Sequence, residues 1–157
     1  MDLSLRFSPS RSYFDLSLDV LKADLLASDS LETAVVLSLL CDRTAGESDV
    51  PAGNDHRGWW ADAFARNQND KFGSRLWLLA REKRTPETVL RARSYIIEAL
   101  QWLIDDGLAT AVDATVFTAG ADWLVAQVQI NLKTGSRQYR FEWSDATQAW
   151  MLQGEVN

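Results

Sequence analysis

The fold is decided by residues 85–107, which read TPETVLRARSYIIEALQWLIDDG. Thr85 suits a helix N-cap, because its hydroxyl accepts a hydrogen bond from an amide of the first turn. Pro86 suits the first helical position, where its missing N–H leaves no bond unmade, and Glu87 lies near the positive end of the helix dipole. Gly107 suits the left-handed conformation that ends many helices. These features predict one helix of about 20 residues, roughly 30 Å long.

This helix is expected to carry one apolar face. Apolar residues that recur at helical spacing predict a stripe of Val89, Leu90, Ile96, Ile97, Leu100, Leu103 and Ile104. Polar and charged residues, including Arg91, Glu98, Gln101 and Asp105, would remain in water. A helix of this length needs a surface to cover its apolar face, and the last third of the chain is the candidate.

After the helix, the hydrophobic pattern alternates with the period of a strand. Alternation predicts strands at residues 111–117, 123–132 and 137–143, with a hairpin turn at 133–136. These strands would form an antiparallel meander with one apolar face, which the long helix covers. The predicted fold class is therefore α+β. Residues 150–152 would form either a fourth short strand or an extended tail that reaches a neighbour.

The first half of the chain gives weaker patterns. Residues 1–12 are expected to form an extended arm, and residues 13–157 are expected to form a single domain. Alternation predicts a strand at 13–19, whereas residues 20–27 fit a returning strand or a loop. A short apolar helix is expected from about Leu31 to Cys41, followed by a polar loop to Arg57. Residues 76–80 fit a short helix or a buried strand, and we favour the helix because Ser74 can cap it.

Composition excludes several classes of function. The chain has 157 residues, 46% of them hydrophobic, with seven tryptophans, which indicates a folded domain with a real core. Its net charge of -6 argues against binding nucleic acid and against docking on anionic membranes. No signal peptide or membrane-spanning run is apparent, which predicts synthesis in the cytoplasm.

No motif for catalysis, cofactor binding or metal binding is found. The chain lacks a phosphate-binding glycine loop and a nucleophile–base motif. Cys41 is expected to be a small buried hydrophobe, and His56 a surface residue. Two rival functions remain open. One is a cell-wall hydrolase, which would need two carboxylates across a cleft, and the other is a free-standing adaptor domain in the cytoplasm.

The most unusual segment is His56-Arg57-Gly58-Trp59-Trp60-Ala61-Asp62-Ala63-Phe64. Paired tryptophans after a polar loop have two interpretations. Both rings could cover the edge of the core. Alternatively, at least one ring anchors a protein partner, since Trp and Arg concentrate at interface hot spots.

Several of these pieces, in this order, resemble the Mu-type phage tail baseplate family. The resemblance rests on residues 31–35 (LETAV), 56–62 (HRGWWAD), 73–79 (GSRLWLL), 81–83 (REK), 85–87 (TPE) and 99–107 (ALQWLIDDG), and it runs from about residue 13 to 143. That family is similar to the baseplate wedge proteins of larger contractile tails, which sit where the sheath begins. The wider group often carries a Glu-Pro-Arg-like motif after its long helix, where this chain has Asp105-Asp106-Gly107.

The resemblance implies a structural, non-enzymatic protein of the virion tail. Several copies would connect wedge, hub and tube components to the first ring of sheath, with no direct contact to nucleic acid or membrane. It further implies that the strands at 123–132 and 137–143 lie near the sheath and offer an exposed edge. Candidate partner contacts are Arg57, Trp59, Trp60, Asp62, Arg75, Asp105 and Asp106. Arg75 could instead pair with an acid of its own domain, and Asp105 and Asp106 could be a solvated helix end.

Overall fold

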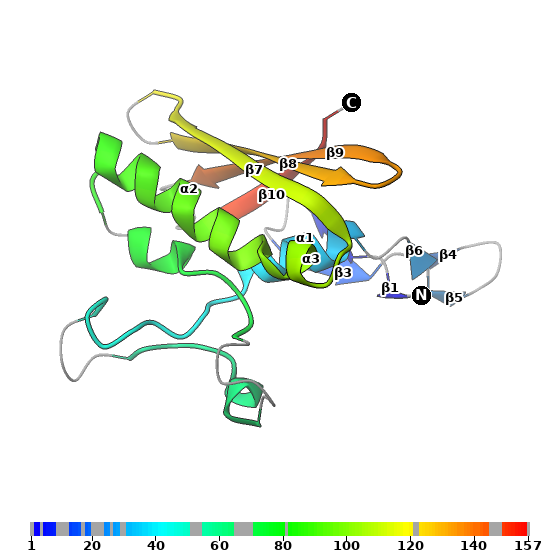
Figure 1. Ribbon diagram of the computed structural model, residues 1–157, viewed down its shortest axis with the longest axis horizontal. Coiled ribbons are helices and arrows are strands. Elements are labelled where there is room, and N and C mark those ends of the chain that lie inside the picture. Colours follow the sequence, from blue (N-terminus) through cyan, green and yellow to red (C-terminus); the bar gives the residue numbers. More distant parts are fainter. Residues whose placement is uncertain are drawn as a thin grey trace. The chain divides into compact units, whose positions relative to one another are not determined.

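The computed structural model in Figure 1 divides into two compact units, residues 1–37 and 38–157. It describes residues 2–3, 5–8, 13–16, 18–19, 24–25, 27–28, 31–50, 55–64, 71–80, 82–120, 123–144 and 149–156. Each unit is described by itself.

The described residues of the first unit form three short antiparallel strand pairs. They are β1 (Asp2–Leu3) with β6 (Ala27–Ser28), β2 (Leu5–Ser8) with β3 (Tyr13–Leu16), and β4 (Leu18–Asp19) with β5 (Asp24–Leu25). The strand predicted at 13–19 thus appears as β3 and β4. Helix α1 (Leu31–Leu40) matches the predicted short helix, and its last three residues belong to the second unit. The division into an arm at 1–12 and a domain at 13–157 stays a prediction.

The second unit is built on the predicted long helix, which occurs as α2 (Pro86–Leu100) and α3 (Trp102–Asp105) with a turn at Gln101. The start is as expected: the Thr88 N–H donates to Oγ1 of Thr85 at 3.3 Å. At the end, Gly107 has φ of 69°, and the Leu108 N–H donates to the Leu103 carbonyl at 2.9 Å. This arrangement closes the helix by satisfying carbonyls of its last turn.

The apolar stripe was predicted only in part. Ile96, Leu100 and Leu103 are buried, but Leu90 is 63% exposed. The buried side of α2 is completed by residues that the stripe omitted, namely Thr88, Ala92, Tyr95 and Ala99. The correction follows from helix geometry, because Leu90 lies on the side opposite the one centred on Ala92 and Ala99. Two alanines on the buried side allow the close approach of α2 to strand β7 that Figure 1 shows.

The C-terminal sheet is antiparallel, in the order β10-β9-β8-β7. Its strands are β7 (Ala109–Thr118), β8 (Trp123–Leu132), β9 (Gly135–Ser144) and β10 (Ala149–Glu155), so residues 150–152 belong to a fourth strand rather than to a tail. Register aligns the buried residues in rows, for example Val116, Ala126, Phe141 and Leu152. The predicted α+β architecture, with a helix on an antiparallel meander, is confirmed.

The fourth strand decides where the sheet edges lie. Strands β8 and β9 are paired on both sides, so the two edge strands are β7 and β10. The strands at 123–132 and 137–143, which the resemblance implied lie near the sheath, therefore offer no exposed edge of their own. Any strand pairing with another chain would therefore use β7 or β10.

Short elements pack against the apolar surface that α2 and the sheet leave uncovered. The 3₁₀ helix η2 (Leu76–Leu79) occupies the predicted helical position and packs against α2. The expected Ser74 cap takes a different form, since the Ser74 hydroxyl donates to the Leu39 carbonyl at 2.6 Å and accepts from the Leu76 N–H at 3.3 Å. A second 3₁₀ helix, η1 (Trp60–Phe64), was not predicted. Apolar side chains from α1, η2, α2, β9 and β10 meet around one small hollow, lined by Leu39, Leu40, Leu76, Ile96, Phe141 and Trp150.

Candidate partner interface

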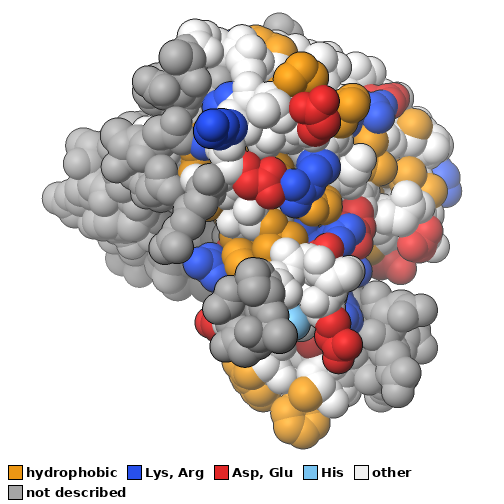
Figure 2. Space-filling model, turned by 90° about the vertical axis from the view of Figure 1, so that its left-hand side faces the viewer, with side chains coloured by type: hydrophobic (Ala, Val, Ile, Leu, Met, Phe, Trp, Pro, Cys, Tyr) orange, Lys and Arg blue, Asp and Glu red, His pale blue; other side chains and the backbone are white. Residues whose placement is uncertain are grey.

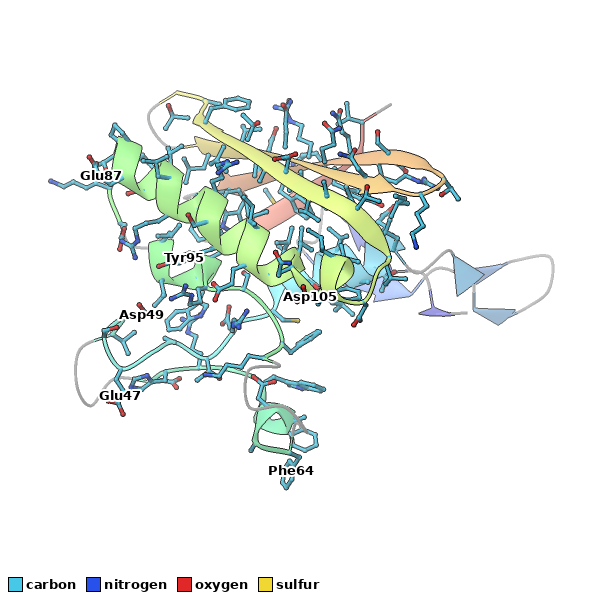
Figure 3. All side chains as sticks on the ribbon, viewed as in Figure 1. Glu47, Asp49, Phe64, Glu87, Tyr95 and Asp105 are labelled. Atoms are coloured by element: carbon cyan, nitrogen blue, oxygen red, sulfur yellow. The ribbon has the colours of Figure 1, made fainter. Side chains whose placement is uncertain are left out.

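Three aromatic rings of the second unit are exposed to solvent. Trp59 is 48% exposed, Trp60 75% and Phe64 79%. The centroid of the Trp60 ring lies 6.1 Å from the centroid of the Trp59 ring and 6.2 Å from that of the Phe64 ring, and both pairs are edge-to-face. We call these three residues the aromatic knob. Figure 3 shows Phe64 at the tip of η1, and Figure 2 shows apolar surface at that end of the molecule.

The backbone that precedes the knob is in an unusual conformation. Arg57 and Gly58 both have positive φ, 52° and 101°. A side chain on Gly58 would also collide with its neighbour, because a Cβ there would lie 1.9 Å from Oγ1 of Thr44. Left-handed backbone at a non-glycine residue persists only where the surroundings impose it, and such strain concentrates at functional sites.

Residues 55–58 are fastened to residues 42–45 by several bonds. The Ala45 N–H donates to the His56 carbonyl at 2.9 Å, and Nδ1 of His56 lies 3.2 Å from the Ala45 carbonyl. The Arg57 guanidinium pairs with Asp42 at 2.7 Å and lies 4.5 Å from the centre of the Trp77 ring. Arg57 therefore fixes the base of the knob, while its ion pair remains exposed to solvent.

Asp62 and Phe72 support the knob from behind. The Asp62 carboxylate accepts a bond from the Phe72 N–H at 3.2 Å, and the Phe72 ring lies 5.1 Å from that of Trp59. The second carboxylate oxygen of Asp62 is buried and accepts no hydrogen bond from the described residues. Trp59 thus contributes both to support and to exposed surface, whereas Trp60 and Phe64 contribute mainly exposed surface.

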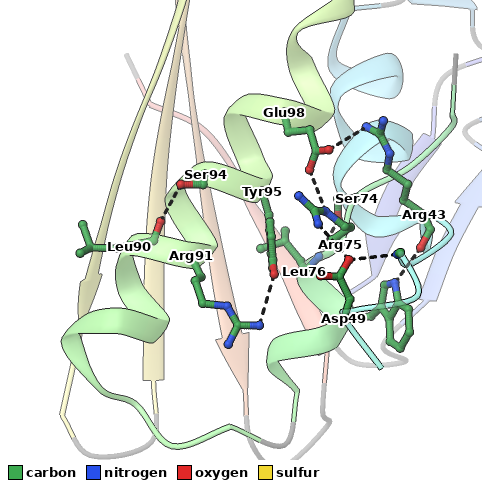
Figure 4. Close-up of polar contacts among 12 residues, drawn as sticks. Arg43, Asp49, Ser74, Arg75, Leu76, Leu90, Arg91, Ser94, Tyr95 and Glu98 are labelled. Atoms are coloured by element: carbon green, nitrogen blue, oxygen red, sulfur yellow. Dashed lines mark hydrogen bonds and ion pairs between the residues drawn. The ribbon is translucent and has the colours of Figure 1, made fainter. Parts of the chain in front are cut away.

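Arg75 lies in an internal network, as its alternative interpretation held. Its Nε and a terminal nitrogen bind Glu98 and Asp49, each at 2.9 Å, and its guanidinium lies 4.6 Å from the centre of the Tyr95 ring (Figure 4). Arg43 approaches Glu98 at 3.7 Å. This network ties the 43–49 loop to α2.

The network changes the acidity of its members. The pKa of Asp49 is lowered, first because the Gly46 N–H donates to the carboxylate and then because Arg75 binds it, while partial burial acts in the opposite direction. Burial lowers the pKa of the Arg75 guanidinium, but its bonds to Asp49 and Glu98 outweigh burial and raise it. Both shifts favour the charged forms, so the ion pairs persist through neutral pH.

Asp105 and Asp106 are exposed at the end of α3. Asp105 accepts a bond from the Gln101 side chain at 3.0 Å, and Figure 3 shows it well apart from Phe64. The structure therefore gathers Arg57, Trp59, Trp60 and Asp62 at one place, whereas Arg75 is held in its own ion-pair network and Asp105 lies at the end of α3. Sequence reasoning missed Phe64 and Phe72. The spacing of four residues between Trp60 and Phe64, one turn apart on a helix, was the available indication.

The described residues suggest no chemistry at the knob. They include no group of three or more His, Cys, Asp or Glu side chains placed to hold a metal ion. Burial, with a contribution from Asp42, raises the pKa of the Cys41 thiol, which makes it a poorer nucleophile. No helix among these residues is long and apolar enough to cross a membrane. An exposed, rigidly held set of rings is instead suited to binding another molecule.

Comparison with known proteins shows the family to which the chain belongs. A family model described as phage protein GP46 matches residues 31–137. Baseplate protein gp46 of Escherichia phage Mu is 44% identical over 115 residues, covering 72% of this chain and 77% of that protein. Mu-like prophage FluMu protein gp46 of Haemophilus influenzae is 38% identical over 124 residues, covering 76% and 84%. The resemblance to Mu-type baseplate proteins is thus confirmed, and the chain belongs to the phage GP46 family.

Proposed function

We propose that this chain is a structural subunit of a phage tail baseplate, in the wedge position where the sheath begins. The proposal draws on the relative from phage Mu, which is named a baseplate protein. In this role several copies surround the hub and tube, contact wedge partners and meet the first sheath ring. The role is one of assembly rather than catalysis, and it places the chain in the virion tail.

One observation carries the bridging role: a single compact unit presents two unlike binding surfaces. The first is the aromatic knob. The second is the edge of the sheet at β10, since no other described strand pairs with its outer side. A subunit with two separate surfaces is able to hold two different neighbours at once.

The two sheet edges are not equivalent. At β7 the Arg93 Nε donates to the Ala114 carbonyl at 2.8 Å, and α2 packs against the strand. A β-strand of another chain would have to displace this bond before pairing with β7. The β10 edge is therefore the better acceptor of a strand from a sheath subunit, by addition of an extended segment to the sheet.

Site-specific photo-crosslinking in assembled particles tests this role. A photoreactive phenylalanine analogue at Gln153, which is exposed on β10, is expected to crosslink to the sheath protein. The matched control is the same analogue at Asp113, which is exposed on β7. Crosslinking from Asp113 alone, or no particle-bound product from either position, would contradict the proposal.

A further inference from the structure

The helical segment formed by α2 and α3 carries a second row of apolar side chains, on the side turned away from Ala92 and Ala99. Leu90, Ile97 and Ile104 recur every seven residues, so they lie nearly in line along the segment. Leu90 is 63% exposed, and Ile97 and Ile104 are partly exposed. Figure 4 shows Leu90 and Tyr95 on opposite sides of α2. The core of the second unit therefore leaves this row largely uncovered.

The residues between these three complete a pattern typical of paired helices. Ser94 and Gln101 alternate with Leu90, Ile97 and Ile104 at spacings of four and three residues, which is the seam that two packed helices share. Gln101 has a helical backbone, with φ of -58° and ψ of -33°, so α3 continues the direction of α2. The Ser94 hydroxyl donates to the Leu90 carbonyl at 3.1 Å, which satisfies it within the helix. A small side chain at this place lets a second helix approach closely.

Leu108 extends the row just beyond the end of α3, and it is 52% exposed. We call Leu90, Ile97, Ile104 and Leu108, with Ser94 and Gln101 between them, the outer row. Exposed apolar surface that is continuous in this way marks an interaction site, whereas single exposed apolar residues are ordinary.

Charge is distributed unevenly along the outer row. Arg91 and Arg93 flank its first half, whereas Asp105 and Asp106 lie at its end, where the helix dipole adds partial negative charge. Arg93, Asp105 and Asp106 form no ion pair with any other described residue, although Arg93 donates to a backbone carbonyl and Asp105 accepts from Gln101. Glu87 lies before the row begins, and Figure 3 shows it at the end of the segment opposite to Asp105.

This distribution fits a second copy of the same chain in antiparallel orientation. When Ile97 of one copy lies against Gln101 of the other, Leu90 comes opposite Leu108 and the small Ser94 comes opposite the large Ile104. The basic half of each row then lies beside the acidic end of the other, and the two helix dipoles oppose each other. A parallel pair would instead place like ends of the two dipoles together.

We propose that two copies of the chain associate through the outer row, with their α2–α3 segments antiparallel about a two-fold axis near Ile97 and Gln101. Each contact then occurs twice, as in any isologous interface. The inference goes beyond the proposed function and does not depend on it. No residue of the aromatic knob or of β10 belongs to the outer row, so the pair uses a surface distinct from the two already described.

Sedimentation equilibrium of the purified full-length chain over a wide range of concentration tests the pairing. Leu90→Glu is expected to weaken dimerisation about tenfold or more, because it places a charge on the apolar seam of both copies. Phe117→Glu is the matched control, since Phe117 is an exposed ring (39%) on β7 that lies outside the row. Its dimerisation is expected to match that of the wild type, and circular dichroism verifies that each variant is folded.

A charge exchange tests the orientation. Arg93→Glu and the double variant Asp105→Arg/Asp106→Arg are each expected to self-associate about fivefold more weakly, because like charges then face each other. An equimolar mixture of the two is expected to associate nearly as well as the wild type, since every mixed pair again places opposite charges together. Any damage that Arg93→Glu does within its own chain persists in the mixture, so recovery reports on the contact between copies.

Three results would overturn the proposal. They are a wild-type chain that remains monomeric at its highest soluble concentration, a dimer that Leu90→Glu leaves as strong as Phe117→Glu does, and a mixture that associates no better than the two variants alone. None of them bears on the baseplate role, which the photo-crosslinking experiment tests separately.

Discussion

Gly58 is pressed against Thr44, so closely that a Cβ on Gly58 would lie 1.9 Å from the Thr44 hydroxyl oxygen. This contact, together with a φ of 101° at Gly58, sets the direction in which Trp59 and Trp60 leave the loop. The presentation of the aromatic knob thus depends on a residue that carries no side chain.

Gly58→Ala should therefore weaken partner binding by disturbing the loop. We expect the variant to lose about 1–3 kcal/mol of unfolding free energy, from the strained φ and the clash together. Gly120→Ala is the control, because Gly120 also has positive φ (78°) but has no atom within 4 Å of an added Cβ. Adding Thr44→Gly to the Gly58→Ala variant should recover the part of the lost unfolding free energy that the clash causes. Urea unfolding measures each variant, and equal losses at Gly58 and Gly120 would show that the contact with Thr44 is unimportant.

Removing the exposed rings should affect assembly without affecting folding. Trp60→Ala and Phe64→Ala are each expected to change the unfolding free energy by less than about 0.5 kcal/mol. Trp143→Ala, which truncates a ring that is only 3% exposed in the core, should lose about 3–5 kcal/mol. Circular dichroism during thermal unfolding compares the three. An unfolded Trp60→Ala protein would assign the ring to the core and refute the anchor.

Arg75 should contribute to stability rather than to partner binding. Arg75→Met leaves Glu98 and Asp49 without their shared cation and is expected to destabilise the fold by about 1–3 kcal/mol. The control Arg137→Met breaks a more exposed pair with Glu155, where the Arg side chain is 47% exposed, and should lose less than about 1 kcal/mol. A double-mutant cycle with Glu98→Gln isolates the pairwise term. A negligible coupling energy between Arg75 and Glu98 would show that their ion pair does not stabilise the fold.

Acid should destabilise the chain through Asp49. Since the folded pKa of Asp49 lies below its usual value of 3.8, its stabilising contribution is complete above that value and disappears as the pH falls through the folded pKa. Asp49→Asn should be less stable than the wild type at pH 7, and the difference should shrink as the pH falls below about 3.8. Urea unfolding at pH 7 and at several pH values below 3.8 measures this. A difference that stays constant with pH would show that the carboxylate charge is not what stabilises the loop.

The parts of the fold that were predictable are those that local sequence determines. The Thr85 cap, the end at Gly107 and the alternation of strands β7, β8 and β9 each follow from residues close together in the chain. The exposure of Leu90 was missed because its apolar side chain placed it in the stripe, although the helical period puts it opposite Ala92 and Ala99. The second sheet edge was left open between residues 137–143 and 150–152, because the pairing of β10 with β9 depends on a tertiary contact that alternation alone does not specify.

The candidate site shows the same division. The paired tryptophans were conspicuous in the sequence, but their exposure depends on Gly58 meeting Thr44, fourteen residues earlier in the chain. Arginine is a residue type that is common at interface hot spots, yet Asp49 and Glu98 from two other segments of this chain bind Arg75. Sequence alone cannot decide between an internal and an external partner for such a side chain.

Immunogold labelling of intact particles would show whether the chain is part of the tail baseplate. Particles are incubated with gold-conjugated antibody to this chain and examined by electron microscopy. We expect label at the tail tip, next to the lower end of the sheath. Absence of label from particles, with the chain abundant in the soluble fraction of the lysate, would contradict it.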